Sequence, residues 1–268
     1  MRPTRVALLV TLVPAVALGA CSYFDEPEPY RPPAYYGPED AEALALGQRL
    51  YQRDCSFCHG SEAAGTDRGP DLITRANGPA LTDFMLRTGR MPIDDPDEPT
   101  RHGPSRYDDE EIAAVVAYLD EELGQPGPGI PELDPERADL AQGRDLYQEH
   151  CSACHATTGI GGAMLAHRDG ERAGIVIPDL AESTPVETGE AIRAGPGAMP
   201  RFGPGLVDDE DLDALVRYVS YLQDPDDRGG LPIGRIGPVI EGAVGWLVGL
   251  GILVLFIRWV GTKRGERP

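Results

Sequence analysis

Two segments of the chain carry the apolar spacing of an amphipathic helix that buries one face. In each, apolar residues recur at positions i, i+3, i+4 and i+7. Asp108 and Asp208 precede these segments and are suitable N-caps. Glu111 and Asp211 add negative charge where the helix dipole favours it. The pattern therefore predicts two helices of the same kind. Their apolar positions are Ile112, Val115, Val116 and Leu119 in the first and Leu212, Leu215, Val216 and Val219 in the second.

A third apolar segment, near the C-terminus, has no polar side. Residues 242–257 carry no charge, and the run lengthens to about 23 residues, 238–260, if Arg258 reaches the membrane surface. A buried core helix is the weaker interpretation, because this helix would be apolar all round. We therefore expect a transmembrane helix over 238–260. The positive-inside rule places the basic tail, 261–268, in the cytoplasm and the rest of the chain outside.

The N-terminus has the pattern of an export signal. Arg2 and Arg5 precede an uncharged apolar run, and residues 1–20 end in Leu-Gly-Ala before Cys21. This ending resembles the lipobox of bacterial lipoproteins, which implies that Cys21 is lipidated in the mature chain. An ordinary cleaved signal peptide and an uncleaved anchor are the alternatives.

The region between the two ends is an internal repeat. Residues 47–59 and 143–155 agree at 8 of 13 positions with a constant offset of 96. Pro-Asp-Leu and Met-Pro follow in both copies at an offset of 108, so the second copy has 12 extra residues, in the Gly-rich stretch 159–174. Each copy opens with a helix that ends just before its first cysteine, and closes with one of the two helices above. We expect two similar domains and an all-α fold.

Segments rich in proline and glycine separate these parts of the 268-residue chain, a length that suits one or two small domains. The expected order is a signal peptide (1–20), a Pro-rich tether (21–38), a first domain (39–124), a linker (125–135), a second domain (136–224), a second linker (225–237) and the membrane helix.

The charge of the chain adds a constraint on partners. The total is −20; because residues 1–20 carry +2 and residues 258–268 carry +3, the region between them carries −25. This acidity argues against nucleic acid as a partner, since phosphates demand clustered Lys and Arg. A charged partner is expected to be basic where it docks.

Each repeat contains Cys-x-x-Cys-His, the attachment motif of c-type haem. Two thiols at this spacing can form thioethers to the two vinyl groups of one porphyrin, and the adjacent imidazole then serves as an axial ligand of the iron. Haem would also supply apolar core to domains of about 85 residues with few aromatics. The sequence therefore predicts two covalent haem c groups. Their attachment residues are Cys55, Cys58 and His59 in the first copy and Cys151, Cys154 and His155 in the second.

Three other uses of these cysteines fit less well. A structural zinc ion would need a fourth protein ligand for each Cys-Cys-His set and would leave the shared order of the repeats unexplained. Thioredoxin-like redox chemistry expects a βαβ context, which the predicted elements lack. A plain disulfide within each pair is compatible with an oxidising compartment.

With these motifs, each copy resembles a class I cytochrome c domain. In that family a methionine after a proline-containing loop is the sixth iron ligand, and Met91 and Met199, each followed by proline, match that position. Histidine and methionine together give a low-spin iron with a raised potential, suited to electron transfer. Core packing is the alternative for a methionine, and we favour it for Met85; Met164 lies only nine residues past its motif. The histidines without a counterpart in the other copy are expected in solvent, and they are His102, His150 and His167.

The resemblance also implies contacts near the haem. In the family a loop proline carbonyl lies against Nδ1 of the proximal histidine, which fixes the ring and tunes its basicity. Pro70 and Pro178 match that position. A glycine and a tyrosine mark the crossing of the first and last helices, although ordinary amphipathic packing predicts the same contacts. The crossing residues are Gly47, Tyr51, Val115 and Tyr118 in the first copy and Gly143, Tyr147, Leu215 and Tyr218 in the second.

The whole arrangement resembles the dihaem cytochrome c subunit of the quinol:cytochrome c reductase, or cytochrome bc complex, of Gram-positive bacteria, over residues 41–260. This implies an electron-transfer subunit of a respiratory translocase in the cell membrane, with no substrate chemistry of its own. The haem on His59 would accept electrons from the Rieske iron–sulfur protein beside the cytochrome b subunit. The haem on His155 would pass them to the copper centre of a cytochrome c oxidase. Neither the lipobox before Cys21 nor the Pro-rich, acidic tether is a feature that we can assign to the family as a whole.

Two alternatives from other classes stay open. The cytochrome subunit of a high-affinity oxidase is also a membrane-bound dihaem protein, but its anchor usually precedes the haem domains. A dihaem peroxidase would need one haem that can open a coordination site, whereas both copies here offer a methionine. A high-spin haem in the resting protein would favour the peroxidase.

Overall fold

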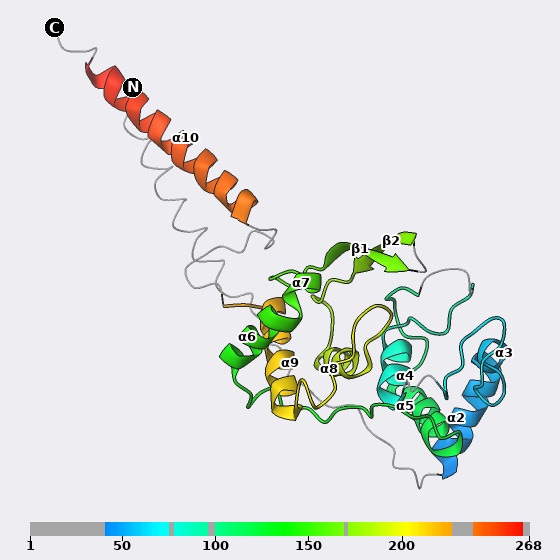
Figure 1. Ribbon diagram of the computed structural model, residues 1–268. Coiled ribbons are helices and arrows are strands. Elements are labelled where there is room, and N and C mark those ends of the chain that lie inside the picture. The colour runs from blue at the N-terminus through cyan, green and yellow to red at the C-terminus, as the bar shows by residue number, and fades with distance from the viewer. Residues whose placement is uncertain (1–40, 75–77, 96–99, 169–170, 227–237, 265–268) are drawn as a thin grey trace. The chain divides into compact units, whose positions relative to one another are not determined.

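The computed structural model describes residues 41–74, 78–95, 100–168, 171–226 and 238–264 (Figure 1). The expected signal peptide, Cys21 and the Pro-rich tether lie outside these residues, as does most of the second linker. The chain divides into a helical body that ends at Ser220 and a C-terminal unit that begins at Tyr221.

The first half of the body, which we define as residues 41–124, is helical wherever it has regular structure among its described residues. The predicted closing helix is present, and the expected cap forms at its start. The Asp108 carboxylate accepts from the Glu111 N–H at 2.9 Å, and the Glu111 carboxylate accepts from the Asp108 N–H at 3.1 Å. The elements are α2 (Ala41–Asp54), α3 (Ser56–His59), α4 (Gly78–Arg87), α5 (Asp109–Ala117) and the π-helix η1 (Tyr118–Glu122).

The second half, residues 136–224, repeats this order with one addition. Its opening helix ends one residue before Cys151, as predicted, and its closing helix is capped by Asp208, which accepts from the Asp211 N–H at 2.9 Å. All eight predicted apolar positions of the two closing helices are buried. The elements are α6 (Leu140–His150), α7 (Ser152–His155), β1 (Gly162–Arg168), β2 (Glu171–Ile177), α8 (Pro185–Ala194) and α9 (Asp209–Gln223).

The addition is a β-hairpin, so the expectation of an all-α fold is wrong in one place and the fold is mostly helical. Strands β1 and β2 pair antiparallel, with Gly162 opposite Ile177. The hairpin fills the stretch between Gly161 and Pro178, where the first half has only the four residues 66–69. It therefore accounts for the 12 extra residues. The expected all-α fold assigned no strand to this Gly-rich stretch, but the run Ile-Val-Ile at the end of β2 favours a strand.

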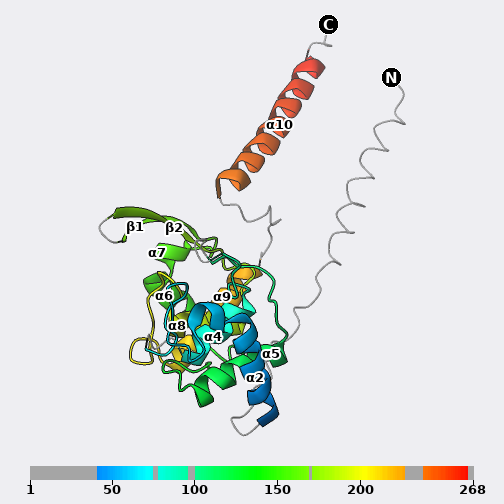
Figure 2. The same ribbon diagram turned by 90° about the vertical axis from the view of Figure 1, so that its right-hand side faces the viewer.

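Each opening helix crosses its closing helix at a glycine. A Cβ on Gly47 would stand 1.9 Å from the Ala114 carbonyl oxygen, and a Cβ on Gly143 would stand 1.9 Å from the Ala214 oxygen. Only glycine permits this approach, which confirms the predicted crossing, although its closest partners are backbone atoms one residue before those expected. Helices α2 and α5 lie side by side in both ribbon views (Figure 2). The tyrosine rings that pack at the two crossings are Tyr51 with Tyr118 and Tyr147 with Tyr218.

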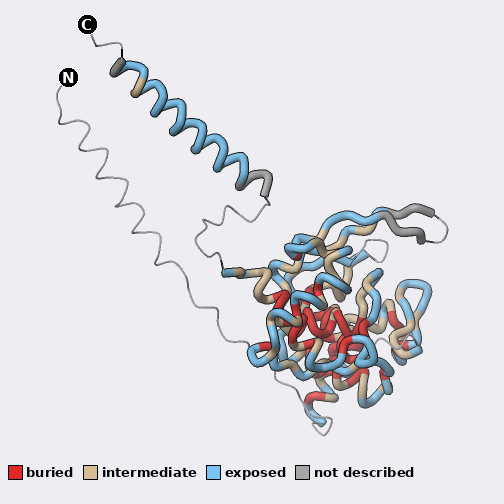
Figure 3. Tube along the Cα trace, turned by 60° about the vertical axis from the view of Figure 1, so that its left-hand side comes forward, coloured by how far each residue is buried: buried red, intermediate tan, exposed pale blue. Residues whose placement is uncertain are grey.

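The two halves meet through helices α4 and α8, which pack against each other. The expected linker, 125–135, takes part in this contact. The Pro128 carbonyl accepts from the Ala80 N–H of α4 at 3.1 Å, and the side chain of Leu133 lies against Gly189 of α8. Buried residues gather in the centre of the body (Figure 3). The halves therefore form one body with the linker between them.

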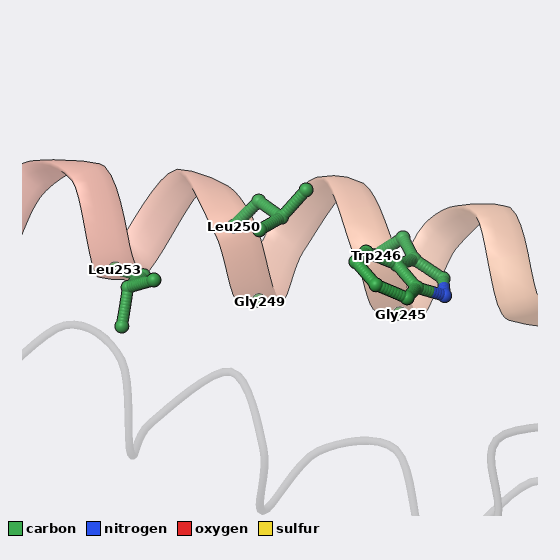
Figure 4. Close-up of a pocket in the computed structure, with 5 residues that line it drawn as sticks. All are labelled: Gly245, Trp246, Gly249, Leu250 and Leu253. Atoms are coloured by element: carbon green, nitrogen blue, oxygen red, sulfur yellow. The ribbon is translucent and has the colours of Figure 1, made fainter.

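The C-terminal unit contains helix α10 (Pro238–Arg264), which runs four residues beyond the predicted end of the membrane helix. Its segment Gly242–Thr262 is long and apolar enough to cross a membrane, and none of it is buried in the protein (Figure 3). This finding agrees with the predicted transmembrane helix. A shallow groove runs along the helix where two glycines lie one turn apart (Figure 4). Its lining residues are Gly245, Trp246, Gly249, Leu250 and Leu253.

Candidate functional site

The first Cys-x-x-Cys-His motif forms a tight helical turn directly after helix α2. The Cys55 carbonyl accepts from the N–H groups of Cys58 and His59, at 3.1 and 2.9 Å. The His59 ring is buried, and its Nδ1 lies 2.8 Å from the Pro70 carbonyl oxygen. A carbonyl can only accept, so Nδ1 carries the proton and Nε2 keeps its lone pair. His59 is thereby oriented to offer Nε2 to a metal ion.

The loop after this motif holds Pro70 in place. The His59 carbonyl accepts from the Gly65 N–H at 2.8 Å, and the Cys58 carbonyl accepts from the Thr66 hydroxyl at 2.5 Å. Gly69 passes so close to Cys58 that a Cβ there would stand 2.8 Å from its carbonyl oxygen. The loop therefore lies directly on the motif.

The second motif repeats this geometry. Nδ1 of His155 lies 3.3 Å from the Pro178 carbonyl oxygen, and the His155 carbonyl accepts from the Gly161 N–H at 3.1 Å. Burial lowers the pKa of His155, against an opposing effect of the hydrogen bond to Pro178. The ring is therefore neutral at neutral pH and has an Nε2 lone pair. The two prolines, whose contacts the family resemblance implied, thus occupy equivalent places in the two halves.

The four motif cysteines are half-buried and form no disulfide in the part of the chain that the structure describes. Burial raises the pKa of Cys55 to about 12, with the charges of Asp54 and Cys58 adding to the effect. Burial likewise raises the pKa of Cys151 to about 11. Thioredoxin-like chemistry needs a thiol whose pKa is depressed. Cys55 and Cys151 are therefore unsuited as nucleophiles for thiol–disulfide exchange at neutral pH, whereas thioether bonds need no thiolate in the finished protein.

The described residues offer no zinc site of the expected kind, because no three His, Cys, Asp or Glu side chains among them converge as metal ligands would. Two thiols on one helical turn, followed by an imidazole with a free Nε2, are instead the donor set of a covalent haem. The residues of both halves fit this group.

The two candidate sixth ligands lie in loops that follow α4 and α8. Met91 is half-buried against the core of the first half, and its N–H donates to the Met85 carbonyl at 3.0 Å. Met199 is half-buried, and its N–H donates to the Pro196 carbonyl at 3.1 Å. Each loop thus holds the methionine backbone in place, and the role of these residues as iron ligands stays a prediction.

The remaining methionines and histidines lie elsewhere. Met85 is half-buried on α4, and Met164 is 38% exposed on β1. The His102 side chain is 45% exposed, with Nδ1 4.0 Å from the Glu182 carboxylate. His150 packs its ring against Phe202. The side chain of His167 lies outside the described part of the structure.

In each half, an arginine that the sequence did not predict as a site residue joins the methionine loop to the closing helix. In the first half Arg87 of α4 donates to Asp109 at 2.6 Å, and in the second half Arg193 of α8 donates to Asp209 at 2.7 Å. Both arginines lie two residues before a glycine that precedes the methionine, Gly89 in the first half. This shared Arg-x-Gly pattern was the available signal, but the unequal loops after it hid the alignment.

Comparison with known proteins agrees with this geometry. The family model described as "Cytochrome C oxidase, cbb3-type, subunit III" matches two separate segments, 42–119 and 138–219. Each segment contains one Cys-x-x-Cys-His motif and ends within or just after a closing helix. Each matched segment therefore lies within one half of the body.

Relatives that match more than four fifths of the chain have a more specific name. The "Cytochrome bc1 complex cytochrome c subunit" of Corynebacterium diphtheriae is 31% identical over 246 residues, which cover 84% of this chain and 83% of that protein. The protein of the same name from Mycobacterium tuberculosis is 30% identical, with 82% and 78% covered. Among solved structures, the Kuenenia stuttgartiensis reducing HAO-like protein complex matches 72% of this chain and 99% of that one at 18% identity and a TM-score of 0.38.

Proposed function

This chain belongs to the family of cytochrome bc1 complex cytochrome c subunits, and we propose that it is a membrane-anchored relay that carries electrons through two haem c groups in series. In this proposal the electrons come from the Rieske iron–sulfur protein, beside the cytochrome b subunit, and leave to the copper centre of a terminal cytochrome c oxidase. The family membership supports the place in the complex. The donor, the acceptor and the number of haems are our inference.

One observation carries the proposal: the same histidine geometry occurs twice. In each half a proline carbonyl accepts from Nδ1 of the motif histidine, at 2.8 Å for His59 and 3.3 Å for His155. Each half would hold one haem through its two cysteines and its histidine. The haem, when bound, supplies the one-electron chemistry of its iron.

The chain's own residues fix how such a group is held. The hydrogen bonds that His59 and His155 donate to the Pro70 and Pro178 carbonyls orient each imidazole and would raise its basicity toward the iron. Met91 and Met199 would complete the coordination. With histidine and methionine both as ligands, neither half would offer an open position for peroxide or oxygen, which favours electron transfer over catalysis.

Orientation in the membrane is also part of the proposal. Helix α10 would span the bilayer, and the basic residues Arg258, Lys263 and Arg264 near its end favour a cytoplasmic C-terminus. The helical body would then lie on the extracytoplasmic side. A tethered body meets its donor and acceptor at a high effective concentration, so it need not find them by diffusion.

The test is quinol-driven oxygen consumption by isolated membranes without added soluble cytochrome c. We expect full activity with the wild-type chain and background activity when Met91 or Met199 alone is replaced by a non-ligating leucine, because haems in series fail together. Normal respiration in either variant would contradict the series relay. A requirement for soluble cytochrome c would instead favour an ordinary reductase subunit.

A further inference from the structure

A carboxyl group is buried without a hydrogen-bond donor where the two halves of the body meet. Glu190 of α8 is 0% exposed, and neither of its carboxyl oxygens accepts a hydrogen bond from any described residue. A carboxylate in such a place loses its hydration and gains no hydrogen bond that would compensate for the loss. The environment therefore favours the neutral, protonated acid.

The charged groups that face Glu190 come from helices α4 and α8. Asp83 of α4 is 2% exposed, and its two oxygens accept from Nε and Nη2 of Arg87 at 2.6 and 3.0 Å. Arg87 also donates to Asp109 of α5 at 2.6 Å. Glu187, three residues before Glu190 on α8, is 7% exposed and adds a further carboxyl group. Arg87 is thus already shared by Asp83 and Asp109, and a second cation, Arg90, acts on Glu187.

Asp83 and Glu190 lie on the two helices that pack against each other, and both side chains are buried. Two buried carboxyl groups can share a hydrogen bond only when one of them holds a proton, because ionised carboxylates are acceptors alone. Asp83 already accepts two hydrogen bonds from Arg87, whereas Glu190 accepts none, so the proton belongs on Glu190. Burial raises the pKa of Glu190 well above its usual range, and the charge of Asp83 adds to this effect.

We propose that Asp83 and Glu190 form a proton-binding site between the two halves, in which one proton held by Glu190 and shared with Asp83 keeps α4 and α8 in contact. The pair is not part of the repeat. When the halves are aligned on Arg87 and Arg193, Glu190 corresponds to Phe84 and Asp83 corresponds to Gly189. The site therefore belongs to the contact between the halves. Resting on the proposed function, it would couple the spacing of the two haem motifs to pH.

The sign of the pH dependence follows from the direction of the shift. A group whose pKa is higher in the folded state stabilises that state at low pH and loses this effect as pH rises through the folded value. For one proton, the equilibrium constant for opening the α4–α8 contact should rise by up to tenfold per pH unit above about 4.5.

The experiment uses the full chain with its haems in detergent. Hydrogen-exchange protection factors of α4 and α8 are measured from about pH 5 to about pH 9. In the wild type they should fall by up to tenfold per pH unit. In Glu190→Gln they should be constant, because glutamine keeps a neutral donor for Asp83 but does not titrate. The control is Glu210→Gln, which makes the same charge change at an exposed position of α9 and should behave as the wild type.

A second measurement covers the case in which Glu190→Gln folds poorly. The infrared spectrum of the wild type at neutral pH should contain a protonated carboxyl band that persists in Glu210→Gln and is absent from Glu190→Gln. Protection factors independent of pH in the wild type would overturn the proposal, and so would an unchanged band in Glu190→Gln. Neither readout depends on electron flow, so a relay that failed the oxygen-consumption test would leave this site standing.

Discussion

Buried charged side chains decide much of the local structure of the body, and Arg193 is the best satisfied of them. It is 6% exposed and donates to the carbonyls of Phe202 and Val207, at 3.0 Å in the first case. It also donates to the carboxylate of Asp209 and the carbonyl of Asp208. This one guanidinium therefore joins α8 to the start of α9 and closes the loop that contains Met199.

We expect Arg193→Ala to lower the free energy of unfolding by about 3 kcal/mol, because it leaves buried carbonyls without donors. Arg144→Ala is the control. Its side chain is 58% exposed and pairs with the adjacent Asp145, so its loss should cost less than about 1 kcal/mol. Denaturant unfolding followed by circular dichroism measures both. Similar losses in the two variants would show that the buried contacts of Arg193 contribute little.

At the scale of elements, the helix crossings fix how each half is built. Gly47 lets α2 approach the backbone of α5, and Gly143 does the same for α6 and α9. We expect Gly47→Ala to destabilise the first half by several kcal/mol, since the new methyl group forces the helices apart. Gly203→Ala, where nothing lies within 4 Å of the new Cβ, should have little effect. Thermal unfolding of both variants tests this, and an equally stable Gly47→Ala would mean that the crossing can adjust.

The crossing helices were predictable because their apolar spacing, caps and glycines are local signals that packing later reinforces. The histidine–proline contacts were predictable from the repeated motif and its family. The hairpin was not predicted, because its glycines give no strand signal until strand pairing brings residues 162–168 and 171–177 together. The site around Glu190 could not be predicted for a different reason. It lies between the two halves, and no pattern in the sequence indicates how the halves pack against each other.

The hairpin can be tested as an insertion. Residues 162–177 stand between Gly161 and Pro178, which make the same contacts as Gly65 and Pro70 in the first half. Replacing them by Thr-Asp-Arg-Gly, the sequence of residues 66–69, should preserve the His155–Pro178 hydrogen bond. We expect both haems to be retained with unchanged reduction potentials, measured by redox titration. Loss of one haem would show that the hairpin is part of the second haem site.

At the scale of the whole molecule, covalent attachment predicts how the cofactors survive unfolding. The denatured chain should keep two haems, because thioether bonds do not depend on the fold. Replacing Cys55 and Cys58 together with serine should leave one. The pyridine haemochrome spectrum of the denatured protein gives the count. Extraction of both haems by acidified organic solvent would show that they are not covalently bound.

The two expected anchors of the chain, a lipid on Cys21 and helix α10, should hold the membrane with different strength. A single lipid chain on Cys21 would bind a membrane reversibly, whereas a spanning helix is effectively permanent. Cys21→Ser should therefore leave the protein in the membrane, and a chain that ends at Asp226 should partition between membrane and solution. The double variant should be soluble with both haems intact, as centrifugation and haem absorbance would show.

Anchoring to the membrane raises the effective concentration of the relay at its donor and acceptor. Oxygen consumption should therefore fall as the protein is released from the membrane, and it should recover when the soluble form is added at high concentration. A double variant that stayed with the membranes would contradict the role of the helix as the anchor.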